Sequence, residues 1–123
     1  MIKMVYCLRR RPELSREEFQ RYWRETHAPL VQKYAQALNL RRYVQVHTSE
    51  HPVNDALRES RGAMEPYDGV AELWWDSADS MATAMASAEG RKAGQALLED
   101  EKRFIDVERS ALWIGQEHAF VER

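Results

Sequence analysis

The sequence predicts a single α+β domain built on a four-stranded antiparallel sheet with helices on one face. Strand-like and helix-like stretches follow one another in the order strand, helices, strand, strand, helices, strand, which is typical of this architecture. The 123 residues are 44% hydrophobic and 31% charged, which suits one globular core and no more. No repeat or linker interrupts the chain, so residues 1–123 are predicted to form one domain.

The N-terminal stretch predicts a strand followed by a capped helix. Residues 2–8 are rich in β-forming side chains and alternate between two faces. Ser15 and Glu18 have the spacing of a capping box, in which each side chain satisfies a backbone amide near the other. The helix that begins there should turn Phe19, Trp23 and Leu30 toward the core.

Pro29 predicts an interruption in this helical region. It lacks an amide proton and disfavours helical geometry in the preceding residue, so we expect the helix to end or kink near His27. A second helical run should cover residues 30–39, and a second strand should cover residues 40–48.

The second half of the chain predicts a long connection, a strand, more helix and a final strand. Residues 49–68 show little periodicity beyond one short helix around residues 54–60, and such long connections are often functional or mobile, as in a lid. Strands are predicted at 69–76 and 110–120, with helix between Ser77 and Ile105.

Large apolar side chains on both faces of the predicted sheet indicate that a second layer covers it. In the third strand Val70 and Trp74 point to one side, while Leu73 and Trp75 point to the other. Helices can cover only one face, and a second copy of the chain is the commonest cover for the other. The pattern therefore predicts a homodimer that packs sheet against sheet.

Several segments together resemble the EthD-like family of the dimeric α+β barrel superfamily. They are "FQRYWRETHAPLV", "RRYVQVH", "YDGVAELWW" and "SAEGRKAGQALLEDEKRFID", and the resemblance covers the chain except for residues 49–66. It implies a ferredoxin-like monomer, a barrel formed by two packed sheets, and a cleft between sheet and helices.

More distant similarity extends to methylmuconolactone isomerases and polyketide cyclases. The isomerase pattern matches at His27, Tyr43 and Glu72, and departs at Leu73, where the isomerases have a cysteine. Fold similarity within such a superfamily is an analogy for function and does not establish a mechanism.

His27 is the candidate catalytic residue, because a histidine can exchange protons near neutral pH. The alternative is a structural ring that packs on Trp23 and bonds a carbonyl at the helix end. The predicted ligand-binding residues are Tyr43, His47, Tyr6, Trp23, Glu72 and Trp75, with a structural ion pair to Lys3 or Arg42 as the alternative for Glu72.

The predicted partners are a second copy of the chain and a small apolar or aromatic ligand. A net charge of -2 favours neither nucleic acid nor anionic membrane, and no run is apolar enough to span a bilayer. Metal-ligand and phosphate-loop spacings are absent, so we predict no metal, haem or other cofactor. One cysteine and no leader-like N-terminus favour the cytoplasm.

These observations leave two functions open. One is an enzyme without cofactor that performs proton-transfer, isomerase, cyclase or oxygenase-type chemistry on an aromatic or polyketide-like compound. The other is a non-catalytic dimer that binds a small ligand for an oxygenase or a degradation pathway. The same cleft with one histidine would serve either.

Overall fold

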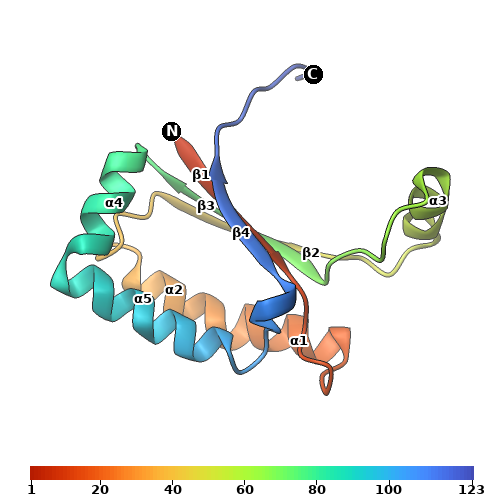
Figure 1. The fold of residues 1–123 in the computed structure, drawn as a ribbon, viewed down its shortest axis with the longest axis horizontal. Helices are drawn as coiled ribbons and strands as arrows, with labels where there is room; N and C mark the ends of the chain where they lie inside the picture. Colours follow the sequence, from red (N-terminus) through yellow and green to blue (C-terminus); the bar gives the residue numbers. More distant parts are fainter.

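The computed structural model describes all residues from 1 to 123 and has the predicted ferredoxin-like fold. Its sheet is antiparallel, with the strand order β2-β3-β1-β4. The strands are β1 (Ile2–Leu8), β2 (Arg42–His47), β3 (Gly69–Trp75) and β4 (Ala111–Gly115). The helices α1 (Arg16–Tyr22), α2 (Ala28–Tyr34), α4 (Ala78–Ala86) and α5 (Ala88–Glu101) gather on one side of the sheet (Figure 1). None of the helices is both long and apolar enough to cross a bilayer.

The last strand is shorter than predicted. It ends at Gly115, which lies opposite Lys3 in the ladder, and β1 begins only one residue earlier. Since β4 is an edge strand whose only neighbour is β1, residues 116–123 have no strand left to pair with. They leave the sheet as an extended tail (Figure 1).

The helix does not break at Pro29 as the sequence predicts. Instead, α1 continues through one π-helical turn, Trp23–His27, directly into α2. The amide of Ala28 donates to the carbonyl of Trp23, five residues back, and Ala28 keeps helical angles. The wider turn accommodates a proline ring that would otherwise clash with the carbonyl four residues before it. The helix therefore does not end near His27, one of the two predicted outcomes, and Pro29 instead follows an irregular, π-helical turn.

The core lies between the sheet and the helices on its covered face. Trp23, Phe19, Phe104 and Leu8 are its largest fully buried side chains. Phe19 contacts both Trp23 and Phe104, with ring centroids 5.7 and 5.4 Å apart. Close aromatic pairs of this kind contribute beyond their buried area, so this cluster fixes the π-helical turn to the segment that follows α5.

Gly69 permits the close approach of Trp23 to the sheet. A Cβ atom at this position would lie 2.4 Å from the Trp23 ring and 2.9 Å from the Val46 carbonyl oxygen. We expect Gly69→Ala to lower the free energy of unfolding by about 1–3 kcal/mol, because the packed ring must shift. Gly94→Ala is the control, since its methyl group would meet nothing within 4 Å and helical alanine is favoured. Equal urea midpoints for the two variants would contradict the packing argument.

The connection between β2 and β3 holds a helix, α3 (Pro52–Arg61), longer than the predicted one around 54–60. The His51 side chain caps its first turn, and Gly62 closes it with a left-handed φ of 59°. Figure 1 shows α3 beyond one end of the sheet, apart from the other helices. This position does not support the predicted lid, because α3 contributes no residue to the cavity described below.

Candidate functional site

An apolar cavity of about 200 Å³ lies between the sheet and the helices. Most of its 18 lining residues are aliphatic or aromatic. Four lining side chains bring polar atoms to this space, namely Tyr6 from β1, His27 from the π-helical turn, Tyr43 from β2 and Glu101 from the end of α5. An apolar hollow with a few converging polar groups is the usual form of a small-molecule site.

His27 is held at the cavity by Asp100. Its Nδ1 lies 2.7 Å from Oδ2 of this carboxylate, whose Oδ1 accepts a hydrogen bond of 2.6 Å from the Tyr22 hydroxyl. The imidazole also packs on Phe104 at a centroid distance of 5.1 Å. Since Asp100 is an acceptor, Nδ1 carries the proton of a neutral ring, and Nε2 remains as a proton acceptor for a ligand.

Burial favours the neutral form of this histidine. It lowers the pKa of His27 below its usual value, and the Asp100 carboxylate offsets only part of that effect. A neutral ring with a fixed tautomer can act as a general base near neutral pH.

A chain of hydrogen bonds along β2 orients the Tyr43 hydroxyl. Gln45 Nε2 donates to the Trp23 carbonyl at 3.0 Å and to the Tyr43 oxygen at 2.8 Å. The Gln45 oxygen must then accept, and His47 Nε2 lies 2.7 Å from it. Because the Tyr43 oxygen already accepts a hydrogen bond, its own proton is free to be donated into the cavity.

Glu101 is a second titratable group on the cavity wall. Burial and, to a smaller extent, the neighbouring Asp100 raise the pKa of Glu101 to about 7, although a hydrogen bond with Tyr6 opposes the rise. The same apolar surroundings raise the pKa of Tyr6. The cavity thus holds a carboxyl group that is substantially protonated at neutral pH.

The structure brings most of the predicted site residues together. His27, Tyr6, Tyr43, Trp23 and Trp75 all line the cavity. The ring of His27 packs on Phe104 and not on Trp23, the partner named in the alternative structural role; Trp23 stacks on His47, 4.5 Å away.

His47 and Glu72 do not line the cavity. His47 is hydrogen-bonded to Gln45, which in turn donates to the Tyr43 oxygen, so His47 affects the cavity only indirectly. Glu72 lies on the opposite face of the sheet, because successive strand residues alternate and both Leu73 and Ala71 face the cavity. There it pairs with Lys3 at 2.6 Å, which is the structural ion pair offered as the alternative.

Sequence reasoning missed Asp100 and Glu101. Ala93 and Leu97, which are spaced to share one face of α5, are both buried. Asp100 is one turn after Leu97 and two turns after Ala93, so helical periodicity could have found it. An acidic "EDEK" run at a helix end is ordinarily solvated, so the pattern offers no reason to place either residue at a buried cavity.

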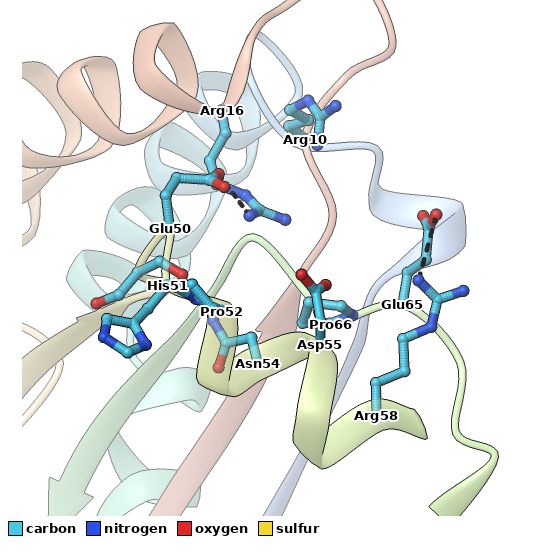
Figure 2. Close-up of a pocket in the computed structure, with 11 residues that line it drawn as sticks. Arg10, Arg16, Glu50, His51, Pro52, Asn54, Asp55, Arg58, Glu65 and Pro66 are labelled. Carbon is cyan, nitrogen blue, oxygen red and sulfur yellow. Dashed lines mark hydrogen bonds and ion pairs between the residues drawn. The ribbon is translucent and has the colours of Figure 1, made fainter. Parts of the chain in front are cut away.

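A larger hollow of about 530 Å³ lies outside the domain core, between the start of α1 and α3 (Figure 2). Apart from Pro52 and Pro66 its lining residues are polar or charged, and ion pairs cross it, such as Arg16–Glu50 at 2.7 Å and Arg58–Glu65 at 4.0 Å (Figure 2). Its charged groups are therefore largely paired with one another. No group of three histidine, cysteine or acidic side chains is arranged to hold a metal. The apolar cavity is the candidate site.

Comparison with known proteins identifies the family. The sequence model described as the EthD domain matches residues 11–108. The chain belongs to the EthD domain family. A comparison of this EthD protein with curated proteins finds no match.

Solved structures share the fold of this EthD protein. An EthD-family protein from Bacillus halodurans is 24% identical, with a TM-score of 0.63 over 96% of this chain and 99% of its own. An EthD-like protein from Ralstonia eutropha is 20% identical, with a TM-score of 0.58 over 99% and 95%. SnoaB from Streptomyces nogalater, described as a cofactor-independent oxygenase, is 12% identical, with a TM-score of 0.57 over 99% and 97%. At these identities the likeness establishes the fold.

Proposed function

We propose that this EthD protein is an enzyme that moves a proton on a small, flat, mainly apolar compound without the help of a cofactor. The observation that carries the proposal is the pairing of His27 with Asp100 at the wall of an apolar cavity. A cavity that only binds an aromatic ring does not require a buried histidine with a fixed tautomer. SnoaB, described as a cofactor-independent oxygenase, has the same fold and lends support to this class of chemistry.

In this proposal Nε2 of His27 removes a proton from an acidic C–H or O–H group of the ligand. Asp100 stabilises the imidazolium that forms, and the Tyr43 hydroxyl donates to the oxygen on which negative charge develops. The resulting anion can be reprotonated elsewhere, cyclise or react with oxygen. Isomerase, cyclase and oxygenase outcomes therefore share this first step.

Size and polarity define the test compounds. The cavity is smaller than the roughly 300–1,000 Å³ of sites for drug-sized ligands, so a bicyclic compound is a suitable probe. A panel of bicyclic ketones of the tetralone type and bicyclic phenols would be incubated with the protein in deuterated buffer. Deuterium incorporation followed by NMR reports proton removal, and calorimetry on the same compounds reports binding.

We expect at least one compound that binds to exchange faster with the protein than in buffer. Compounds that bind but exchange no faster would overturn the enzyme proposal in favour of the accessory binding dimer. A panel in which nothing binds would overturn both functions for this cavity.

We further propose that the working form is a homodimer that packs sheet on sheet. The face of the sheet away from the helices carries Val46 and Trp113, which are 46% and 52% exposed. Light scattering at micromolar concentration should give the mass of two chains. The interface between them should bury roughly 2,000 Å² or more in total. Trp113→Glu should shift the protein toward a monomer, whereas Leu98→Glu, on exposed α5 surface, should not. A stable monomer in the unmodified protein would contradict the dimer.

A further inference from the structure

Glu101 has no evident structural task, although it occupies part of an apolar cavity wall. It is half-buried at the end of α5, and none of the ion pairs of the molecule includes it. A carboxyl group in such a place is costly unless it remains protonated or is partnered. The Tyr6 hydroxyl is the one neighbouring side chain that lowers the pKa of this carboxyl group.

The groups around Glu101 are acidic or neutral. Tyr6 lies near it on β1, and Asp100 precedes it on the same helix. The charge of Glu101 contributes to the raised pKa of Tyr43 on β2. His27, from the π-helical turn, lines the same cavity but is already bonded to Asp100. No lysine or arginine contributes to the environment of Glu101, so nothing there stabilises a second negative charge.

We propose that Glu101, which lines the same cavity as His27 and Tyr6, is the proton donor of this site, and that the substrate is a neutral enolisable ketone or the corresponding phenol. This inference rests on the proposed function of His27 as a base. It adds an acid to that base and specifies what the ligand presents to it.

The proposed step conserves atoms and charge. Nε2 of His27 takes a proton from the carbon next to the carbonyl group, and the C–H electron pair forms the C=C bond of the enol. The C=O π electrons move to oxygen, which takes the proton of the Glu101 carboxyl group. The products are a neutral enol, an imidazolium paired with Asp100, and a Glu101 carboxylate. Reversal returns a solvent-exchanged proton to carbon.

The two groups titrate in the order that this step requires. Burial lowers the pKa of His27 and raises that of Glu101 to about 7. Neutral His27 and protonated Glu101 therefore coexist just below pH 7, and opposite shifts in two neighbouring groups are typical of an acid–base pair. The charge of the Asp100 carboxylate, joined by that of Glu101 once it ionises, also disfavours an anionic ligand, which separates neutral ketones and phenols from carboxylates.

The test compares Glu101→Gln with Glu99→Gln, an exposed carboxylate on the same helix. Deuterium exchange into a bicyclic ketone of the tetralone type would be measured between pH 5 and 9, and binding of the same ketone and of naphthoate would be measured by calorimetry. We expect the unmodified protein to lose exchange activity as the pH rises through about 7. Glu101→Gln should lower the maximal rate by about 10²-fold and remove this alkaline decline, since general acids typically contribute ~10²–10⁴-fold.

Binding provides the second readout. The ketone should bind the unmodified protein, Glu101→Gln and Glu99→Gln with similar affinity, and naphthoate should bind appreciably only to Glu101→Gln at pH 8. Tyr6→Phe should retain exchange but move the alkaline decline to higher pH, because it removes the hydrogen bond that favours the carboxylate.

Unchanged exchange and an unchanged alkaline decline in Glu101→Gln would overturn this inference while leaving His27 as the base. Naphthoate binding the unmodified protein as tightly as the ketone would overturn the substrate class. The proposed function itself fails if the unmodified protein shows no exchange at all. It also fails if His27→Gln and the unmodified protein exchange at the same rate.

Discussion

Replacing His27 with Gln should reduce ketone exchange by about 10²–10⁴-fold, the usual contribution of a general base. A glutamine amide can still donate to Asp100, so much of the local geometry survives, but it cannot accept a proton at neutral pH. Exchange followed by NMR at pH 7 measures the effect directly.

Asp100→Asn provides the matched control for the role of the histidine. The asparagine keeps the shape of the side chain but replaces the carboxylate that holds Nδ1 and stabilises the imidazolium. We expect a smaller rate loss than in His27→Gln, with the acid limb displaced to lower pH, because the Asp100 carboxylate raises the pKa of His27. An unchanged rate in His27→Gln would eliminate this residue as the base.

His27 should also contribute to stability, because it both lines the cavity and packs in the core. It is only 5% exposed, bonded to Asp100 and packed on Phe104. Catalysis and packing, which the sequence presents as alternatives for this residue, are combined in the structure. His27→Ala should therefore lower the free energy of unfolding by about 1–3 kcal/mol as well as removing activity.

The largest loss of stability is expected for Asp68→Ala. This carboxylate is 3% exposed and accepts hydrogen bonds from the Arg10 amide at 2.8 Å, the Arg10 guanidinium at 2.7 Å and Arg16 at 3.0 Å. It thereby ties the start of α1 and the end of β1 to the loop before β3. Its removal strands two arginines, which are partly exposed and can be rehydrated, so we expect a loss of about 3 kcal/mol.

Ionised Asp68 should also make part of the free energy of unfolding sensitive to acid. Burial opposes its ionisation, but the hydrogen bonds from Arg10 and Arg16 outweigh burial and lower the pKa of Asp68. A carboxyl group with a lowered pKa stabilises the fold above its unfolded pKa of about 3.9, and that stability is lost as the pH falls through the folded value. Urea unfolding at pH 7 and pH 3 should show a smaller difference for Asp68→Ala than for the unmodified protein.

Asp76→Ala is the control for this prediction. Asp76 is 62% exposed and lies 3.5 Å from Arg41, and such surface pairs contribute about 0–1 kcal/mol. Equal losses in the two variants would contradict the assignment of Asp68 as a buried ionic anchor.

The sequence alone determined the strand and helix order, and with it the fold. Alternation in β1 separated the core-facing Tyr6 and Leu8 from Lys3, and the capping pair Ser15 and Glu18 located the start of α1. Local signals sufficed here because the period of a strand and the cap of a helix depend on neighbouring residues only. The same alternation could have excluded Glu72 from the cavity, since Leu73 beside it faces the helices.

Only the tertiary structure decided what surrounds His27. Its partner Asp100 lies 73 residues away, and the acid Glu101 meets Tyr6 across 95 positions of the chain, so no local pattern could connect them. The turn at Pro29 was also decided by packing, because the buried rings of Phe19, Trp23 and Phe104 hold the chain in a helical path that Pro29 alone disfavours. Titration behaviour follows from burial and from neighbours in space, and these arise only when α5 packs against the sheet.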